Sequence, residues 1–530
     1  MFRVIAVLLA MIFAGSACSG PDASSDQEPV TPTAPPSATT SPGPLREMTP
    51  TPMGVMPTPT ASVSPTASAT RSPELTATAT LTPTVLPTPL PPTPTAVPLR
   101  ASPESQAIAL PNVNAQYQLA ISELDVDSGY LRASEIVTIS ALEGVPSPLF
   151  LQVVPAWDGF FTLLEMTVDD VVVEPSVLHG GFTLAVPLQV GAPEAVIAMD
   201  FELRVGAEAS GWGGTSLDGS VLRLGYWFPI VSTDHGYSDT LDPSYTDVAS
   251  FDVSLTVDPD VAFSYTGEIV EEAALDDGRV RYVMRADNVR DFALALSRDY
   301  TRDRVVSEAG VAVELYSIDT ASETRSAVLA WAVDAIDQLS ALIGPYPYAT
   351  FRIADAGPSM PGGVEFPGMV YYNPNYAQLD RLIYHEVAHQ WLYGIIGTRT
   401  LDDGWVDEGG AEFFERGLPT GFAEVPTVPP GGYEYPLDAA SGELLADASR
   451  QWYFSIYEQG ARLYYAVAET MGWEAFWQAM RALYDTYAFG IATSWDVLET
   501  WQLHSPVDLR PLFDETFRYD WIDQLPEPGG

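Results

Sequence analysis

The sequence contains no lysine, a single cysteine and only five histidines among 530 residues. With one cysteine, Cys18, no disulfide can form within the chain, so packing must stabilise its folded part. The basic residues are all arginine, and 70 acidic residues outnumber them to give a net charge of −46. A negative field of this size argues against nucleic acid and anionic lipid as partners. It is compatible with cationic peptide partners, or with high solubility alone.

Residues 1–18 have the features of a secretion signal. Arg3 precedes the apolar run Val4–Ala14, which is too short to span a membrane comfortably, and small residues lead up to Cys18. The segment "AGSAC" resembles a bacterial lipobox, in which the cysteine is lipidated and becomes the new N-terminus. Ordinary signal-peptidase cleavage near Ala17 is the alternative. We expect export across the cytoplasmic membrane and lipid anchoring through Cys18 at the extracellular face.

Residues 19–105 lack aromatic side chains and apolar periodicity. They consist mainly of proline, threonine, serine and alanine, as in "TPTATLTPTVLPTPLPPTPT". Such a tract cannot bury enough apolar surface to offset the entropy of ordering it. We expect a semi-extended stalk that holds the folded part away from the membrane.

Residues 106–300 read as strands. Apolar and polar residues alternate in Phe251–Val257, Arg279–Ala286 and Phe292–Ser297, and turn signals separate these runs. A period of two with frequent turns predicts a β-sandwich or a saddle-like sheet domain.

Residues 301–525 change to a helical period. Thr324–Gly344 predicts a helix with one apolar face and a Gly-Pro stop. An extended piece, Pro361–Asn373, follows, and further helices are expected through "YHEVAHQW", through "VDEGGAEFFERG" and from Tyr453 to about Phe517. Strands first and helices later indicate an α+β chain with two folded domains.

The segment "HEVAH" places two of the five histidines four residues apart. Residues with this spacing lie on one face of a helix, so His385 and His389 can direct imidazole nitrogens at one metal ion. Glu386, one step round the helix, can take a proton from water at the open coordination position. The alternative is a chance match on a structural helix, which the scarcity of histidine makes rare.

Glu408, on the next expected helix, supplies a candidate third ligand. Two antiparallel helices joined by a short loop can bring its carboxylate to the two histidines. Two imidazoles and a carboxylate suit zinc, with the fourth place left to water. We therefore expect one Zn²⁺ per chain. Asp402 and Asp403 could orient a ligand histidine, or could belong to a solvated loop.

The motifs together resemble those of the aminopeptidase N family of zinc metallopeptidases. "HEVAH" followed after 18 residues by Glu408 is the metal signature of the gluzincins. "GWVDEGGAEFFE" is similar to the family's W-L-N-E-G-F-A-E segment, "GGVEFPG" to its G-x-M-E-N motif, and "IYEQGARLYY" to its Y-E-K-G-A helix. The resemblance implies a thermolysin-like, mainly helical catalytic domain after the β domain.

The resemblance also implies roles for single residues. His385, His389 and Glu408 correspond to the zinc ligands, and Glu386 to the general base. Tyr457 corresponds to the tyrosine that donates a hydrogen bond to the tetrahedral oxyanion. Glu365 corresponds to the glutamate that holds the free α-amine of the substrate. Gly362 and Gly363 leave room for a peptide backbone along the extended segment.

The sequence departs from the family at several points. Val364 and Phe366 stand where the G-x-M-E-N motif has methionine and asparagine. No clear counterpart of a second amine-holding acidic residue is found in the β domain. The chain ends soon after the expected catalytic domain, so we expect a cleft more open than one roofed by the family's large C-terminal helical domain.

The sequence therefore predicts a zinc metallopeptidase that acts on peptides, most simply an aminopeptidase. An endopeptidase or oligopeptidase with the same zinc chemistry is an alternative that an open cleft permits. A non-catalytic surface binding protein that keeps the zinc fold is a second alternative, which the presence of Glu386 and Tyr457 disfavours.

Overall fold

The computed structural model describes residues 110–206, 214–237, 245–423, 437–438 and 453–529. All of them belong to one compact unit, Thr93–Gly530. The expected signal segment with Cys18, the whole of the expected stalk (19–105) and the first four residues of the expected β domain (106–109) lie outside the described residues. Within the described residues, no helix is long and apolar enough to cross a membrane.

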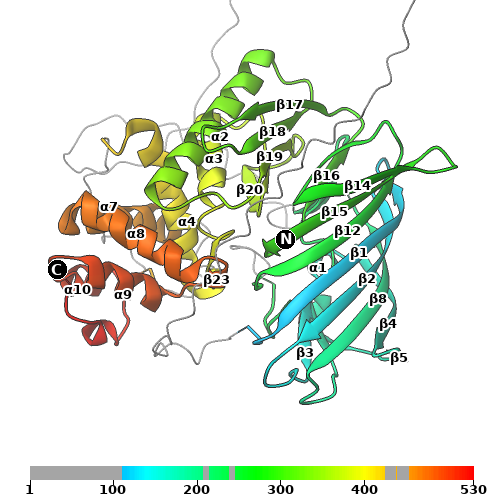
Figure 1. Cartoon of the computed structure of the whole chain (residues 1–530), viewed down its shortest axis with the longest axis horizontal. Helices are drawn as coiled ribbons and strands as arrows, with labels where there is room; N and C mark the ends of the chain where they lie inside the picture. The colour runs from blue at the N-terminus through cyan, green and yellow to red at the C-terminus, as the bar shows by residue number, and fades with distance from the viewer. Residues whose placement is uncertain (1–109, 207–213, 238–244, 424–436, 439–452, 530) are drawn as a thin grey trace, which may run out of the picture. The chain divides into compact units, whose positions relative to one another are not determined.

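An eight-stranded sheet forms the largest layer (Figure 1). In sheet order its strands are β14 (Glu268–Ala274), β15 (Val280–Val289), β12 (Ala249–Val257), β1 (Asn114–Asp125), β2 (Tyr130–Ser140), β8 (Glu194–Arg204), β4 (Phe161–Val168) and β5 (Val171–Val172). Neighbouring strands are antiparallel except β1 and β12. Buried and half-buried residues alternate along β12 from Phe251 to Val257, as its sequence pattern predicts.

Two four-stranded sheets accompany this layer. The first contains β13 (Ala262–Tyr265), β16 (Leu294–Ser297), β10 (Val221–Leu224) and β9 (Thr215–Asp218). The second contains β11 (Ile230–Ser232), β3 (Leu149–Gln152), β7 (Thr183–Val186) and β6 (Ser176–Leu178), with the short helices α1 (Val154–Trp157) and η2 (His179–Gly181) beside it. One hydrophobic core contains Leu119 of β1, Leu151 of β3 and Leu224 of β10, so the three sheets share it.

A mixed five-stranded sheet follows, where the sequence predicted only an extended segment. Its order is β17 (Thr301–Val306), β18 (Ala312–Ser317), β19 (Thr350–Asp355), β21 (Met369–Tyr372) and β20 (Gly363–Phe366). The three central strands are parallel, and β17 and β20 are antiparallel edge strands. The expected α+β class is confirmed, but the C-terminal half has more sheet than expected.

Helices make up most of the remaining chain. They are α2 (Ser322–Leu342), α3 (Leu379–Ala388), α4 (Thr400–Gly417), η3 (Leu418–Thr420), the π-helix η4 (Phe454–Gln459), α7 (Gly460–Met471), α8 (Trp473–Tyr487), α9 (Ser494–His504), α10 (Arg510–Asp514) and η5 (Ile522–Gln524). A small sheet joins β22 (Ile396–Gly397) to β23 (Gly490–Ile491). The helix predicted at Thr324–Gly344 is α2, displaced by two residues at each end.

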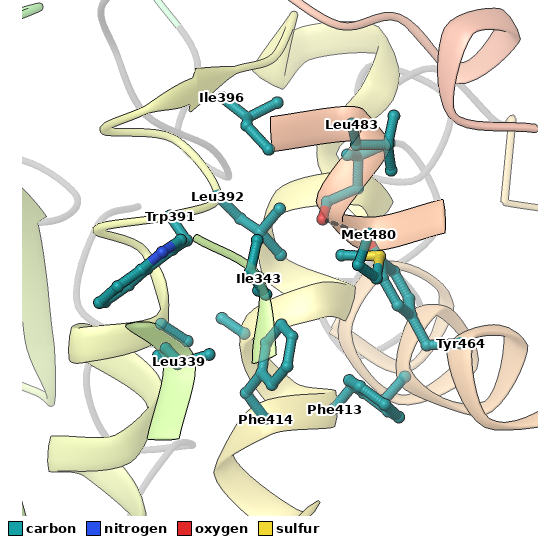
Figure 2. Packing of buried hydrophobic residues seen from close by; sticks show 14 of the residues in the cluster. Leu339, Ile343, Trp391, Leu392, Ile396, Phe413, Phe414, Tyr464, Met480 and Leu483 are labelled. Atoms are coloured by element: carbon teal, nitrogen blue, oxygen red, sulfur yellow. Dashed lines mark hydrogen bonds between the residues drawn. The ribbon is translucent and has the colours of Figure 1, made fainter. Parts of the chain in front are cut away.

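Aromatic and aliphatic side chains from several helices form one core (Figure 2). They come from the end of α2, the segment after α3, and from α4, α7 and α8. The labelled members are Leu339, Ile343, Trp391, Leu392, Ile396, Phe413, Phe414, Tyr464, Met480 and Leu483. This packing holds α3 and α4, the two helices that carry the sequence-predicted metal ligands, in fixed register.

Buried arginines join the β-rich half to the helical half. Arg290, at 2% exposure, donates to the carbonyl oxygens of Thr246 at 3.0 Å and Tyr393 at 2.8 Å. Arg352 donates in the same way to Tyr265 at 3.0 Å and Gly267 at 2.7 Å. Because buried carbonyl groups need hydrogen-bond partners, Arg290 ties the β-rich half to the segment after α3, and Arg352 ties β19 to the end of β13.

Candidate metal centre and active site

Helix α3 presents the two histidines on one face. His385 lies in its last turn and His389 caps its C-terminus, while Leu382, Ile383 and Val387 are buried against the core. The two Nε2 atoms are 3.1 Å apart. The apolar side of this helix therefore anchors it, and the polar side brings both imidazoles to one point.

Glu408 reaches the same point from α4. Its Oε2 atom lies 3.3 Å from Nε2 of His385 and 3.3 Å from Nε2 of His389. The ligands of a tetrahedral zinc ion, each about 2.0–2.1 Å from the metal, are spaced about 3.3 Å apart. The three donor atoms already form a triangle of this size, so the residues fit a zinc ion.

The far nitrogens of both histidines meet carboxylates. Nδ1 of His389 lies 2.7 Å from Oδ1 of Asp407, and Nδ1 of His385 lies 3.3 Å from Oε2 of Glu415. The hydrogen bond between Nδ1 of His389 and Asp407 leaves Nε2 of that ring free to bind metal and fixes the ring orientation. Glu415 lies at ion-pair distance from His385, whose Nδ1 atom has no hydrogen-bond partner among the described residues. The sequence analysis did not find either carboxylate.

Asp402 and Asp403, the two residues weighed for that orienting role, lie elsewhere. Asp403 is buried and accepts hydrogen bonds from Arg399 and Ser494, and Asp402 is exposed. Neither belongs to the groups of side chains close enough to hold a metal among the described residues.

The electrostatics of the site favour positive charge. Burial lowers the pKa of His385, but the nearby carboxylates of Glu408 and Glu415 outweigh it and raise that pKa to about 10. Burial acts against ionisation of Glu408 as well, yet its hydrogen bonds with the two histidines hold its pKa well below the usual range. A divalent cation supplies positive charge at this place, as the donor set requires.

Glu386 is placed beside the donor triangle, in a buried position. It is 3% exposed, and its Oε2 atom has no hydrogen-bond partner among the described residues. Burial raises its pKa to about 7 against the opposing effect of the two imidazoles. Strand β20 approaches so closely that a Cβ atom at Gly363 would lie 2.3 Å from Oε1 of Glu386. A buried carboxylate of this kind is suited to exchange protons near neutral pH.

Tyr457 completes the site from the π-helix η4. Its hydroxyl donates to Oε1 of Glu408 at 2.5 Å, and its ring stacks on His385 with the centroids 6.0 Å apart. Burial raises its pKa well above the usual value, so the phenol stays neutral and keeps its proton for donation.

Gly409 and Gly460 let α4 and α7 touch, since a Cβ at Gly409 would lie 2.7 Å from Cα of Gly460.

Glu365 lies on edge strand β20 beside the histidines. It is 6% exposed, and its Oε1 atom is 3.8 Å from Nδ1 of His389. Gly362, the residue before β20, has open space beside it: a Cβ atom there would meet nothing closer than 3.9 Å. The structure thus brings together the eight residues that the sequence named for catalysis, metal binding and substrate binding. Cys18, named for lipidation, lies outside the described residues.

Phe366, which replaces the family asparagine, does not enter the site. It is fully buried and packs against Tyr226 and Tyr371, with ring centroids 5.1 and 4.9 Å apart. A Cβ atom at Gly225 would lie 2.3 Å from its ring. Its carbonyl oxygen accepts a hydrogen bond from Gln390 at 3.0 Å. Phe366 therefore anchors β20 on the side of the strand that faces Tyr226 and Tyr371. The orientation of Glu365 is then set by the backbone of β20.

Comparison with known proteins gives two kinds of match. No protein-family model matches the chain. Leukotriene A-4 hydrolase of Xenopus laevis is 31% identical over 80 residues, which is 14% of this chain and 13% of that protein. Leucine aminopeptidase 2 of Aspergillus oryzae is 28% identical over 119 residues, 21% of this chain and 19% of that protein. The matched part spans less than a fifth of the length of these curated relatives.

Solved structures match much more of the chain. The M1 zinc metallopeptidase of Deinococcus radiodurans superposes with a TM-score of 0.57 at 17% identity, covering 80% of this chain and 98% of that one. The fold is that of the M1 zinc metallopeptidases. Legionella pneumophila aminopeptidase A, with a TM-score of 0.61 at 16% identity, covers 78% of this chain and 50% of its own. The M1 fold confirms the resemblance that the sequence motifs indicate.

Proposed function

We propose that this chain is a zinc-dependent aminopeptidase that removes N-terminal residues from peptides. The observation that carries the proposal is the donor triangle of His385, His389 and Glu408, with edges of 3.1, 3.3 and 3.3 Å, beside the buried carboxylate of Glu386. The aminopeptidase names of the curated relatives support it. So does a Deinococcus radiodurans M1 structure, a mutant crystallised with the substrate Tyr-Ser-Ala.

Zinc, when bound, supplies a positive charge that polarises the scissile carbonyl and makes water more acidic. Glu386 accepts the proton of the attacking water and passes it to the leaving amine. Its carboxylate is buried and has one oxygen without a hydrogen-bond partner among the described residues, so it is available for both transfers. Tyr457 turns its hydroxyl from Glu408 to the developing oxyanion, where a neutral donor stabilises negative charge.

Glu365 selects the free N-terminus of the substrate. Its carboxylate is only 6% exposed and lies on the edge strand beside the donor triangle, 3.8 Å from Nδ1 of His389. A carboxylate at this place can accept charge-assisted hydrogen bonds from the α-ammonium group of a peptide. Gly362 and Gly363 leave the edge of β20 open to the peptide backbone, which can add to the strand by main-chain hydrogen bonds.

The test compares a free-amine peptide with its N-acetylated twin, using the zinc-loaded protein and the variants Glu365→Ala and Glu386→Gln. We expect cleavage of the free peptide only, with at least a 10²-fold loss in Glu386→Gln at unchanged zinc content. Equal cleavage of both peptides that is indifferent to Glu365→Ala indicates the endopeptidase or oligopeptidase alternative. No hydrolysis with zinc bound indicates the non-catalytic binding protein.

We also propose a thermolysin-like catalytic domain over residues 301–525, after a β domain that spans residues 106–300. The two helices that carry the zinc ligands, α3 and α4, and the edge strand β20 support this division. Limited proteolysis followed by mass spectrometry tests the boundary near residue 300. A cut within β18 or β19 as the first event contradicts it, because those strands are fully buried.

We further propose that the protein is tethered to the outer face of the membrane through a lipid on Cys18 and the stalk of residues 19–105. The lipobox-like "AGSAC" and the Pro/Thr/Ser composition support this. Partitioning of the full chain and of Cys18→Ser in a bacterial host between membrane and soluble fractions is the test. Equal release of both forms into the soluble fraction contradicts the tether.

A further inference from the structure

Gln390 links the metal-binding helix to the strand that carries Glu365. It directly follows His389 and is 0% exposed. Its Nε2 atom donates to the carbonyl oxygen of Phe366 at 3.0 Å, and its Oε1 atom accepts from the backbone N–H of Gly368 at 2.8 Å. Since a carbonyl only accepts and an N–H only donates, these partners fix which end of the amide carries the nitrogen. The side chain thus holds the turn between β20 and β21.

The turn from Phe366 to Met369 needs a hydrogen-bond partner from outside the hairpin. Pro367 and Gly368 are its central residues, and both are buried. Gly368 has a φ of 76°, which glycine accommodates without strain. The N–H of a central turn residue is not used by the ladder of the hairpin, and a buried N–H without a partner is costly. Gln390 supplies the partner.

The start of β20 is fastened independently of Gln390. The backbone N–H of Asn373 donates to the carbonyl oxygen of Gly362 at 2.9 Å, and its Nδ2 atom donates to that of Met360 at 2.5 Å. Gly363, which packs on Glu386, lies at this end of the strand. The contact that positions Glu386 therefore has its own support.

Glu365 lies at the other end of β20, beside the turn. It directly precedes Phe366, and its Oε1 atom is 3.8 Å from Nδ1 of His389. The path from Glu365 to His389 through the hydrogen bond of Gln390 crosses one further residue on each side, Phe366 and Gln390. The ring contacts of Phe366 tie the hairpin to β21 and to the segment after β10, and not to α3. Gln390 is therefore the tie between the Glu365 end of β20 and the metal ligand.

We propose that Gln390 is a positioning residue that sets the place of Glu365 relative to the zinc ligands, and through it the preference for a free α-amine. The inference rests on the proposed function, because Glu365 is the group that holds the amine. An amide offers one donor group and one acceptor, which match the carbonyl and the N–H of the turn. A small displacement of Glu365 weakens its hold on the amine, because charge-assisted hydrogen bonds depend on geometry.

The test is a double-mutant cycle on the zinc-loaded full chain, with Gln390→Met, Glu365→Ala and their combination. In the native background we expect Glu365→Ala to lower kcat/KM for an unblocked peptide by about tenfold or more. In the Gln390→Met background the same change is expected to lower kcat/KM by no more than about twofold, because the carboxylate is already displaced. Gln390→Met alone raises KM more than it lowers kcat and keeps one zinc per chain.

Two further variants accompany the cycle. Tyr346→Phe is the matched control, because the Tyr346 hydroxyl donates to Oε1 of Gln390 at 3.4 Å and its loss leaves both bonds to the turn in place. It is expected to keep the native KM and the native effect of Glu365→Ala. Gln390→Asn keeps the amide on a shorter side chain that cannot reach both backbone groups. It is expected to raise KM as Gln390→Met does, and serves if the methionine variant does not fold.

The cycle separates this inference from the proposed function. If the native protein prefers the free peptide but the losses of Gln390→Met and Glu365→Ala multiply, the positioning role is overturned and the aminopeptidase assignment stands. A Gln390→Met variant with native KM overturns the role in the same way. If the native protein cleaves the free and the N-acetylated peptide equally, the proposed function fails and the inference with it.

Binding to the zinc-loaded Glu386→Gln variant, measured by calorimetry, gives a readout that does not depend on turnover. We expect the unblocked peptide to bind about tenfold more tightly than its N-acetylated twin. Adding Gln390→Met is expected to bring the two affinities within about twofold of each other, while Tyr346→Phe leaves the difference unchanged. A preference for the free amine that survives Gln390→Met overturns the proposal.

Discussion

At the residue scale, the hydrogen bond between Asp407 and the far side of His389 decides how firmly a metal is held. Asp407 is 1% exposed and lies 2.7 Å from Nδ1 of His389. Without that acceptor, the imidazole loses its fixed orientation and its preferred tautomer.

We predict that Asp407→Ala weakens zinc affinity by about 10–100-fold. Competition with a chromophoric chelator measures the affinity. Asp402→Ala is the matched control, because Asp402 lies in the same helix but is exposed and outside the site. Equal weakening in both variants contradicts a specific role for Asp407.

The metal ligands could be predicted from the sequence, but the residues that orient them could not. Scarce histidines at a helical spacing stand out, and Glu408 follows at a family-like distance. Acidic residues are common in this chain, so Asp407 carries no pattern of its own. Glu415 does carry a pattern: Glu408, Glu412 and Glu415 follow the spacing of one helix face, which places Glu415 on the same side of the helix as the metal ligand Glu408.

At the scale of single elements, the close packing of β20 on α3 positions the catalytic carboxylate. Gly363, the first residue of β20, and Gly362, the residue before it, differ in how closely they approach α3. A Cβ atom at Gly363 would lie 2.3 Å from Oε1 of Glu386, whereas a Cβ at Gly362 would meet its nearest atom at 3.9 Å. The close approach of β20 to Glu386 therefore requires glycine at position 363 but not at position 362.

We predict that Gly363→Ala lowers kcat by 10-fold or more, because Glu386 must shift, and that overpacking lowers the free energy of unfolding by about 1–3 kcal/mol. Gly362→Ala is the matched control and is expected to keep kcat within about twofold. Steady-state kinetics and urea unfolding of both variants provide the measurement. A Gly363→Ala variant with native kcat shows that β20 does not position Glu386.

The strands of the five-stranded sheet escaped sequence analysis for a physical reason. Every residue of β18 and β19 is buried, including the charged Glu314, Arg352 and Asp355, so polarity in the sequence does not report burial in these strands. Each strand is also only six residues long, too short for its periodicity to distinguish it from other buried segments. The long helix α2 and the alternating strands of the larger sheet were predicted because one side of each faces solvent.

At the scale of the whole molecule, buried charges in the β-rich half couple stability to pH. Asp291, next to the interface residue Arg290, is 1% exposed, and burial raises its pKa from 3.8 to about 7. Over this range the folded protein keeps a proton that the unfolded chain has released. The free energy of unfolding contributed by Asp291 therefore falls as pH rises from about 4 to about 7, and is constant above.

We predict that Asp291→Asn gains stability relative to the native protein by roughly 2 kcal/mol more at pH 8 than at pH 5. Urea unfolding at the two pH values measures the difference. Asp287→Asn, at an exposed position of β15 four residues earlier, is the control and is expected to show no such change. A difference between Asp291→Asn and the native protein that stays constant with pH contradicts an ionisable buried Asp291.

We propose that His385, His389 and Glu408 hold a zinc ion at which the first peptide bond of an unblocked peptide is cleaved. The most direct measurement is mass spectrometry of the products formed from an unblocked pentapeptide by the protein loaded with one zinc per chain. We expect one free amino acid and the tetrapeptide that lacks the N-terminal residue as the first products, with no products after zinc removal and recovery when zinc is restored. Internal fragments that keep the original N-terminus, or hydrolysis that survives complete zinc removal, would contradict it.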